Sequence, residues 1–427
     1  MNDNYANDIK YTIDKSITTK LLHWYAHHAR ELPWRQDINP YHIWLSEIML
    51  QQTRALTVIP YYERFLKRLP TIEDLANVNE DELMKLWEGL GYYRRARNLQ
   101  KTAKMIVTDF DGMFPKTYDA IRKLPGIGPY TAGAISSICF NLPYPAIDGN
   151  VLRVFARFLE ITESVDQVKT KQKVDNALVG VYKALLAEDS FFCKDDVAHG
   201  KSNTNQSDTN QSDQPHLCGT LTQAIMELGA TVCIPNGVPM CNQCPLQDCC
   251  RAFFHDTVMQ LPVRNDKKAK RDEELTVLIL FREGNIAIHR RPDKGLLAGM
   301  WELPNLEGHV TERGVKIWAD EHNLSPIAIA TGPSHTHVFT HIRWHMQSCF
   351  VECGNLADGA DSADTGSVDT DSTDSDVNIG VDRTDTSSAG DNTDDNTDTD
   401  ADFIWVTPQE LTETYALPTA FRKFISR

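Results

Sequence analysis

The chain has 427 residues, enough for two or three domains that each bury a core. Its hydrophobic content of 41% is typical of a globular protein. No apolar run approaches the ~20 residues that a membrane-spanning helix needs, and residues 1–15 lack the basic and apolar regions of a signal peptide. These features disfavour a membrane or secreted protein and predict a cytoplasmic one.

The formal net charge of −16 taken alone disfavours a DNA-binding protein. Residues 355–402, however, contain fifteen Asp and one Arg, a net charge of −14, which leaves −2 for the rest of the chain. A nearly neutral remainder can present a local basic face to nucleic acid. The acidity of the sequence is therefore mostly a property of one segment.

Two kinds of periodicity divide the chain. Apolar residues recur at helical spacing through residues 16–140, and the helical pattern resumes at 220–230. Later runs of β-branched and aromatic residues predict strands, at 274–281, 285–291, 343–351 and 403–407. Helices are expected among these strands near 312–322 and 408–415. An all-α domain followed by an α+β domain is predicted.

Composition supplies the expected boundaries. We expect an N-terminal tail at 1–15, a first domain at 16–261, a charged linker at 262–273 and a second domain at 274–427. Two polar, low-complexity segments, 199–216 in the first domain and 355–402 in the second, lack the apolar residues of a folded core. Both are expected to be disordered inserts.

The segment LPGIGPYTAGAI (124–135) predicts a helical hairpin. Gly126 and Gly128 can adopt positive φ in a tight turn and let backbone amides approach a ligand, and Pro129 suits the first position of a helix. Amides exposed at such a helix start suit a DNA phosphate. A plain interhelical turn is the alternative.

Two carboxylates stand in informative settings. Asp148 precedes an amphipathic helix in AIDGNVLRVFARF (146–158), where a simple N-cap is the alternative to a functional role. Glu47, in YHIWLSEIMLQQT (41–53), has apolar neighbours that favour its neutral form, as a general acid requires. An exposed helical glutamate is the alternative there. Glu47 and Gln51 are four residues apart and are expected on one helix face.

The combination LPGxG and DGNVxRV resembles the helix-hairpin-helix glycosylase superfamily. In its bifunctional members a lysine on the second hairpin helix attacks the sugar, whereas Tyr130 occupies that place here and cannot form a Schiff base. Together with 41–53, the segments LPWR (32–35) and EGLGYYRRARNLQK (88–101) are similar to the adenine DNA glycosylases of the MutY family.

This resemblance implies roles for four active-site residues. Glu47 would protonate the adenine ring, and Asp148 would stabilise the oxocarbenium-like sugar. Tyr130 would steady this pair, and Asn150 would supply an active-site hydrogen bond. The cleavage needs a proton donor on the base side and negative charge on the sugar side, which two carboxylates in different environments supply.

The resemblance also implies the contacts with DNA. Five residues in three separate segments would contact the duplex: Gln51 and Gln52, Tyr92, and Gly126 and Gly128. Of these, Gln52 and Tyr92 would wedge into the base stack, while Arg35 and Arg94 would contact a phosphate or the adenine. The implied partner is double-stranded DNA with adenine opposite 8-oxoguanine or guanine, bound by a monomer associated with the nucleoid.

A cysteine cluster predicts a metal site. Cys233, Cys241, Cys244 and Cys250 have seven, two and five residues between them, where the family pattern has six, two and five. Four such thiolates could bind zinc or a [4Fe–4S] cluster, and the resemblance implies the cluster. Cys249 leaves the fourth ligand open, and free cysteines are the alternative to a metal site.

The second domain resembles the Nudix-like domain of the same family, which recognises 8-oxoguanine opposite the adenine. The resemblance rests on residues 295–305 and 335–345. Residues 308–324 lack the RExxEE pattern of Nudix hydrolases, so this domain is expected to read DNA without hydrolysing nucleotides. The family's Phe-Ser-His recognition loop corresponds to Phe339, Thr340 and His341, and an ordinary strand histidine is the alternative for His341.

Three other functions remain open on the sequence. The first is a bifunctional pyrimidine-type glycosylase and lyase, which Tyr130 disfavours. The second is a DNA-binding relative without catalysis, which the two carboxylates disfavour. The third is a nucleotide-sanitising hydrolase, which the missing RExxEE disfavours.

Overall fold

A computed structural model describes residues 16–187, 216–266, 269–354 and 403–425. The chain divides into two compact units, Met1–Lys268 and Ala269–Arg427. The predicted tail 1–15 and the insert 355–402 lie outside the described residues, as does the 199–216 insert apart from His216.

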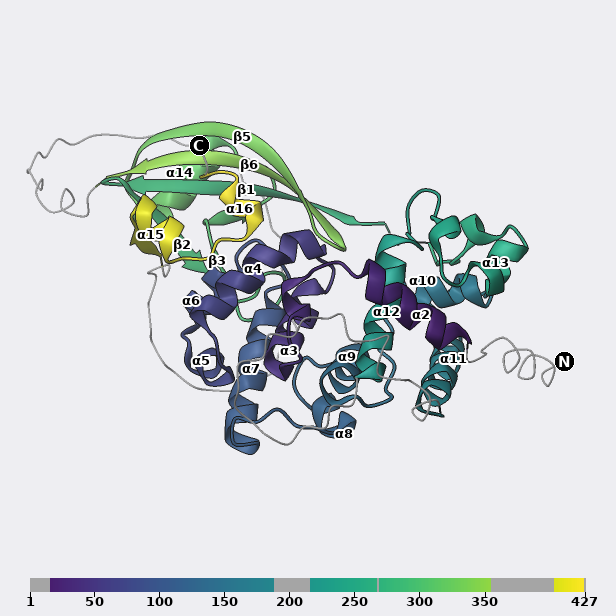
Figure 1. The fold of residues 1–427 in the computed structure, drawn as a ribbon. Coiled ribbons are helices and arrows are strands. Elements are labelled where there is room, and N and C mark those ends of the chain that lie inside the picture. Colours follow the sequence, from purple (N-terminus) through teal and green to yellow (C-terminus); the bar gives the residue numbers. More distant parts are fainter. Residues whose placement is uncertain (1–15, 188–215, 267–268, 355–402, 426–427) are drawn as a thin grey trace, which may run out of the picture. The chain divides into compact units, whose positions relative to one another are not determined.

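The first unit is built from helices, as the apolar periodicity predicts (Figure 1). Its α-helices are α2 (Ser16–His28), α3 (Pro40–Leu50), α4 (Ala55–Arg68), α5 (Ile72–Asn77), α6 (Glu80–Trp87), α7 (Arg94–Asp109), α8 (Tyr118–Arg122), α9 (Pro129–Phe140), α10 (Gly149–Phe158), α11 (Val168–Ala187), α12 (Leu217–Thr231) and α13 (Arg251–Phe254). Four 3-10 turns join them: η1 (Pro33–Arg35), η2 (Cys241–Gln243), η3 (Gln247–Cys249) and η4 (Val258–Gln260). None of the described helices has both the length and the apolar composition that crossing a bilayer requires.

Local chemistry sets where several of these helices begin. Asn39 caps α3 by accepting a hydrogen bond from the amide of Tyr41, and Pro40 occupies the first helical position. Thr71 and Asp74 form a reciprocal capping box at the start of α5. Asp148 caps α10. The sequence thus specifies the helix starts through short-range hydrogen bonds.

Helices α2, α10, α11 and α12 share one hydrophobic core, with Leu21, Phe155, Val181 and Leu228 fully or almost fully buried. Helix α9 is buried along most of its length, and small residues allow this. A Cβ atom on Gly133 would lie 2.2 Å from the carbonyl oxygen of Pro145. The chain leading to Asp148 therefore runs directly against the second hairpin helix.

The second unit is built on a seven-stranded sheet of order β3-β2-β1-β6-β5, in which β4 also pairs with β1 and β7 with β2. Its strands are β1 (Arg271–Arg282), β2 (Asn285–Arg290), β3 (Trp301–Glu302), β4 (Asn305–Glu307), β5 (Pro326–Val338), β6 (Ile342–Cys353) and β7 (Ile404–Val406). Its helices are α14 (Glu312–Glu321), α15 (Pro408–Glu413) and α16 (Thr419–Arg422). Strands β1 and β6 are parallel.

Alternate residues of β1 supply two cores on opposite faces of this sheet. Val277 and Ile279 pack in the cluster that includes Phe421 of α16, whereas Leu278 and Leu280 pack in the cluster that includes Val315 of α14. Helix α14 and helix α16 therefore belong to different faces. The predicted order of an all-α region followed by an α+β region is confirmed.

The sequence located strands β1, β2, β6 and β7, but it misplaced the start of β1 and did not predict β3, β4 or β5. Strand β1 starts at Arg271, three residues before the predicted start, because its parallel pairing with β6 begins at Arg271 and Ile342. The end of the expected 262–273 linker is thus strand. Strand β5 was not predicted, since its pairing is interrupted between Thr331 and Ser334 and its sequence there contains Gly332 and Pro333.

Candidate active site and cysteine module

Glu47 lies on α3 with only 6% of its surface exposed. Burial raises the pKa of its carboxyl to about 7, and the charge of Asp148 acts in the same direction, while Tyr130 and Arg35 oppose the shift. The Tyr130 hydroxyl donates a hydrogen bond to Glu47 Oε2. A carboxyl with this pKa is partly protonated near neutral pH, which suits a general acid.

Asp148 is a helix cap and a member of the same site. Its Oδ1 accepts a hydrogen bond from the amide of Val151 at 2.7 Å, and its Oδ2 accepts one from Asn150 Nδ2 at 2.7 Å. Burial raises the pKa of Asp148, while these hydrogen bonds and the charge of Arg153 lower it in part. The capping role considered from the sequence is real and does not compete with a role in the site.

Tyr130 comes from the first turn of α9, directly after the hairpin turn. Its pKa lies well above the ordinary value, first because of burial and then because of the charges of Glu47 and Asp148. The phenol is therefore a stable O–H donor close to both carboxylates. The structure brings Glu47, Tyr130 and Asp148 together from three separate helix ends.

The hairpin turn is partly as predicted. Gly126 has φ +76°, and a Cβ there would lie 2.7 Å from Cβ of Asn98. The expectation of positive φ at Gly128 is wrong: it has φ −85° and ψ 175° because it is the N-cap of α9, where an extended backbone begins the helix. A Cβ on Gly128 would meet no atom within 4 Å among the described residues.

The expectation that Gln51 continues the helix of Glu47 is wrong. Helix α3 ends at Leu50, and Gln51 turns the chain with ψ 112°. Its Nε2 lies 3.5 Å from Thr131 Oγ1, directed at the hairpin helix. Gln52 and Tyr92 are exposed, and the Tyr92 hydroxyl donates to Gln52 Oε1 at 2.5 Å. The two expected wedge residues therefore meet at the surface.

Sequence reasoning missed Arg153, which lies inside the DGNVxRV motif. Its Nη2 donates to Asn150 Oδ1 at 2.9 Å and to the carbonyl of Gly229 at 2.7 Å, and its Nε donates to the carbonyl of Cys233 at 2.7 Å. A continuous chain of hydrogen bonds thus runs from Asp148 through Asn150 and Arg153 to the first cysteine of the cluster. The sequence did contain a signal for this role, because Arg153 is a charged residue within an amphipathic helix that is largely buried.

Glu227 on α12 was also missed. It is completely buried, and it pairs with Arg30 Nε at 2.6 Å and Arg35 Nη2 at 2.7 Å. Burial acts to raise its pKa, but the hydrogen bonds from both arginines lower it to about 2. Arg35 is therefore held in place by an ion pair with a carboxylate nearly 200 positions along the chain. Arg94, the other arginine considered, is exposed.

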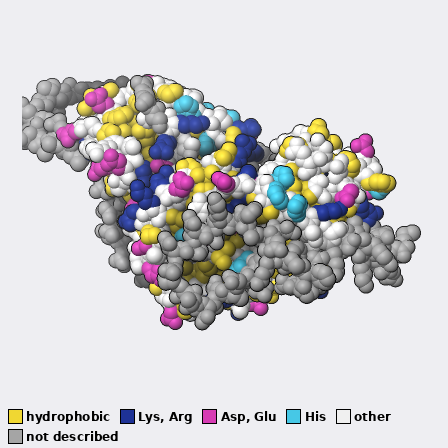
Figure 2. Space-filling model, viewed as in Figure 1, with side chains coloured by type: hydrophobic (Ala, Val, Ile, Leu, Met, Phe, Trp, Pro, Cys, Tyr) yellow, Lys and Arg dark blue, Asp and Glu magenta, His cyan; other side chains and the backbone are white. Residues whose placement is uncertain are grey.

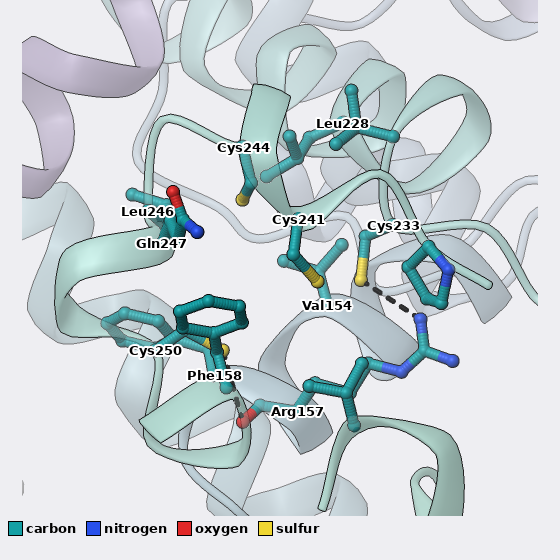
Figure 3. Close-up of a pocket in the computed structure, with 14 residues that line it drawn as sticks. Val154, Arg157, Phe158, Leu228, Cys233, Cys241, Cys244, Leu246, Gln247 and Cys250 are labelled. Atoms are coloured by element: carbon teal, nitrogen blue, oxygen red, sulfur yellow. Dashed lines mark hydrogen bonds between the residues drawn. The ribbon is translucent and has the colours of Figure 1, made fainter. Parts of the chain in front are cut away.

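Four cysteines line one cavity of the first unit: Cys233, Cys241, Cys244 and Cys250. Figure 3 shows their sulfur atoms around this space, contributed by the end of α12, by η2 and by the loop before α13. Cys249 does not line the cavity, and its thiol instead lies 3.5 Å from the carbonyl of Leu246. The geometry separates Cys250 from Cys249, which spacing alone could not do.

The surroundings of this cavity suit an anionic thiolate-bound group. Arg157 is buried on α10, and its Nη1 lies 3.3 Å from Cys233 Sγ, as the dashed line in Figure 3 marks. Apolar side chains such as Val154, Leu228 and Leu246 line the remaining walls. No group of three or more His, Cys, Asp or Glu residues close enough to hold a single metal ion occurs within the described ranges.

The predicted recognition triplet forms the turn between β5 and β6. Its backbone is closed by a hydrogen bond from the amide of Phe339 to the carbonyl of Ile342 at 2.8 Å. Phe339 is half-buried, with ring centroids 4.6 Å from His337 and 4.8 Å from Trp344. Thr340 and His341 are exposed. One aromatic ring thus anchors a turn whose two polar residues face solvent.

The overall negative charge is not a property of the described surface. On the face drawn in Figure 2, Lys and Arg side chains gather in several groups, with Asp and Glu side chains interspersed among them. The fifteen Asp of residues 355–402 lie outside the described residues. The net charge of −16 is therefore a poor guide to the electrostatics of the described surface.

Comparison with known proteins agrees with this geometry. The family model of the HhH-GPD superfamily of base excision DNA repair proteins matches residues 45–183 of the sequence. The family model of the NUDIX domain matches residues 276–427. An adenine DNA glycosylase of Buchnera aphidicola subsp. Baizongia pistaciae is 32% identical over 334 residues, which are 78% of this chain and 84% of that protein. The chain belongs to the adenine DNA glycosylase family.

Relatives of this family extend to mammals. The adenine DNA glycosylase of Mus musculus is 34% identical over 68% of this chain and 60% of its own length, and that of Homo sapiens is 32% identical over 69% and 58%. Among solved structures, a thermostable thymine-DNA glycosylase matches 56% of this chain and 97% of its own with a TM-score of 0.44 and 23% identity. The predicted fold class, a helix-hairpin-helix glycosylase domain followed by a Nudix-like domain, is confirmed by the two family matches.

Proposed function

We propose that this family member releases adenine from duplex DNA in base excision repair, and that Glu47 and Asp148 carry the reaction. The observation that carries the proposal is the buried Glu47 carboxyl, with its pKa raised to about 7 and its hydrogen bond from Tyr130. Asp148 lies beside the pair in a different, hydrogen-bonded environment. Two carboxyls with separated environments can serve as an acid and a charge partner.

The proposed reaction begins with extrusion of the adenine from the stack, at a cost of a few kcal/mol. Neutral Glu47 donates a proton to the adenine ring, so that the base can leave as a neutral molecule. The C–N bond then breaks, and its electron pair goes to the departing base. The ionised carboxylate of Asp148 stabilises the positive charge that develops on the sugar until water adds.

Tyr130 supports a monofunctional enzyme. Its hydroxyl is committed to Glu47, and a phenol cannot form the Schiff base that a lyase needs. Asn150 supports the site from the other side, because its amide donates to Asp148 while its carbonyl oxygen is held by Arg153. Both residues thus orient a carboxyl without forming a covalent bond to DNA.

The second unit is proposed to read the opposite base. We infer that the Phe339–Thr340–His341 turn recognises 8-oxoguanine, or guanine, opposite the adenine. The support is the arrangement of a packed aromatic ring with two exposed polar residues at a hairpin turn. DNA contacts of the first unit are proposed at Gly126, Gly128, Gln51 and the pair Gln52 and Tyr92. A monomer acting at the nucleoid is the corresponding expectation.

We further propose that Cys233, Cys241, Cys244 and Cys250 hold a [4Fe–4S] cluster. All four line the same cavity, and Arg157 offers a positive charge and a hydrogen bond to Cys233 Sγ. Such a cluster would stabilise this module and, through the Arg153 hydrogen bonds, the segment that bears Asn150. The chemistry on adenine needs only the chain's own carboxyls.

The decisive test of the activity is single-turnover adenine release from a duplex with one 8-oxoG:A pair. Wild-type protein should release adenine, and Glu47→Gln should be slower by about 10²- to 10⁴-fold because the proton donor is lost. Borohydride should trap no more than a trace of covalent adduct. A strong adduct, or undiminished release by Glu47→Gln, would contradict the proposal.

The cluster is tested by comparing Cys250→Ser with Cys249→Ser. Purified Cys250→Ser should lose most of its iron and unfold at a lower temperature, because the cluster loses a ligand. Cys249→Ser is the matched control, since its thiol lies outside the cavity, and it should keep wild-type iron content. Equal iron loss in both variants, or zinc in place of iron in wild type, would overturn the assignment.

A further inference from the structure

Arg95 joins two loops that are far apart in sequence. It is buried on α7, and its Nη1 donates to the carbonyls of Ile48, Met49 and Gln51 at 2.6, 3.1 and 2.8 Å. Its Nη2 donates to the carbonyls of Leu90 and Gly91 at 3.2 and 3.1 Å. One guanidinium therefore holds the turn after α3 and the turn before α7 at the same time.

The two carbonyls that matter most precede strained residues. Gln52 has φ +59° and Tyr92 has φ +49°, a region that residues other than glycine rarely adopt. The carbonyl just before Gln52 is that of Gln51, and the one just before Tyr92 is that of Gly91. The hydrogen bonds from Arg95 orient the peptide unit that precedes each of these residues, and that orientation helps to set φ.

These residues form what we call the wedge pair, Gln52 and Tyr92. Both are exposed, with 49% of the Tyr92 surface accessible, and the tyrosine hydroxyl donates to the glutamine side chain. The Arg95 guanidinium carbon also lies 5.6 Å from the Tyr92 ring centroid. The buried arginine and the exposed pair are thus one connected assembly.

We propose that Arg95 is a positioning residue that holds the wedge pair in its DNA-inserting conformation before DNA binds. The inference rests on the proposed function, in which the pair contacts DNA, and on the wedge role that the family resemblance implies for it. Gln52 and Tyr92 then adopt their left-handed conformations when the protein folds. No DNA-binding energy has to be used to order them while the base is extruded.

The same face of α7 also supports the hairpin turn. Asn98 packs beneath Gly126, and Thr102 Oγ1 donates to the carbonyl of Pro125 at 2.7 Å. Arg95, Asn98 and Thr102 follow one another at helical spacing of three and four residues, so they lie on one face. Helix α7 therefore sets the separation between the wedge pair and the proposed phosphate site.

Lysine cannot replace this arginine. A guanidinium presents its donors in a planar fork that reaches two sets of carbonyls, whereas an ammonium is a single point with three donors. Arg95→Lys keeps the positive charge but can hold at most one of the two loops. Arg97→Lys is the matched control, because Arg97 lies on the same helix and pairs with Glu80 near the surface.

The test uses the full chain with two duplexes, one with an 8-oxoG:A pair and one with adenine opposite an abasic-site analogue. On the first, Arg95→Lys should slow single-turnover release by about 10- to 100-fold, the range expected when a reacting group is misplaced. On the second, where the adenine has no pairing partner to break, the loss should fall to within about threefold. Arg97→Lys should match wild type on both.

A double-mutant cycle separates this role from a general structural one. In a chain that already carries Gln52→Ala and Tyr92→Ala, adding Arg95→Lys should cause little further loss, because its effect passes through the wedge pair. Equal losses on both duplexes, or additive losses in the cycle, would overturn the inference. Wild-type protein without adenine release would instead contradict the proposed function.

A second measurement remains decisive even if Arg95→Lys folds poorly. A 3-fluorotyrosine placed at Tyr92 in otherwise wild-type protein should give one narrow ¹⁹F resonance in the absence of DNA, because the pair is already held. Binding of the 8-oxoG:A duplex should shift this resonance without narrowing it further. Several resonances in free protein that merge on DNA binding would show that DNA, and not Arg95, orders the pair.

Discussion

The carboxyl site of the first unit and the Phe339–His341 turn of the second are built on opposite principles. Glu47 is buried, and both oxygens of Asp148 accept hydrogen bonds from the protein. In the proposed recognition turn, by contrast, Phe339 is the anchor, and Thr340 and His341 are exposed. One region is embedded in the protein, and the other lies at its surface.

This difference shows how the two proposed tasks, proton donation and base recognition, place different demands on the structure. A proton donor needs a raised pKa, and burial is the largest cause of it here, so the site must be embedded in the fold. A group that reads a base must instead be reachable. Changes in the carboxyl site should therefore lower the rate and can also alter pH dependence or stability, whereas changes in the turn should alter discrimination alone.

The largest expected effect separates the two roles of Asp148. Asp148→Asn should keep the helix cap but lose the charge beside the sugar, so adenine release should fall by about 10³-fold with little change in stability. Asp148→Ala should lose a similar factor in rate and also about 1 kcal/mol of stability, because the cap is lost. Single-turnover rates and urea unfolding measure both. Equal stability of the two variants would refute the capping role.

The next largest effect concerns stability against pH. The pKa of Glu47 rises from 4.5 when unfolded to about 7 when folded, so folding binds a proton between these values and stability decreases as pH rises from 4.5 to 7. Glu47→Gln does not titrate, so at pH 8 it should be more stable than wild type by about 3 kcal/mol, the equivalent of the pKa difference. At pH 4 the two should be similar.

Denaturant unfolding of Glu47→Gln and wild type at several pH values checks this expectation. Glu63→Gln, an exposed residue of α4, is the matched control and should follow wild type at every pH. A stability difference that is constant from pH 4 to pH 8 would contradict the raised pKa. It would leave the proposed proton transfer without its physical basis.

The smallest expected effect belongs to the recognition turn. His341→Ala should reduce the preference for 8-oxoG:A over G:A by about 10-fold, the equivalent of one lost hydrogen bond, and it should leave stability unchanged because the side chain is exposed. His345→Ala is the control, since His345 lies on the same hairpin but pairs with Asp272. A uniform loss on both substrates would assign His341 to general DNA binding.

Much of the site could be predicted because its signals are local. Apolar neighbours in 41–53 were enough to predict a raised pKa for Glu47, and the Gly-Pro step placed the start of α9. Cysteine spacing indicated a metal module, although it could not decide between Cys249 and Cys250. Each of these inferences needs only residues within about one helical turn or loop of one another.

Other features depend on residues that the sequence separates widely. Glu227 meets Arg35 across 192 positions, and Arg95 meets Ile48 across 47. No short-range periodicity encodes such pairs, since they form only when helices pack. The same holds for Gln51, whose carbonyl is bound by Arg95 where α3 ends.

The amino-acid sequence by itself determined most of the helical segments, four of the strands and the cap at Asp148, and it indicated the side chains proposed to carry the chemistry. These properties follow from hydrogen bonds and apolar spacing within a few residues. Tertiary structure alone decided how far the pKa of Glu47 rises, which cysteines line one cavity and how Gln52 meets Tyr92. Burial and the electric field at a side chain depend on neighbours that the fold brings from distant parts of the chain.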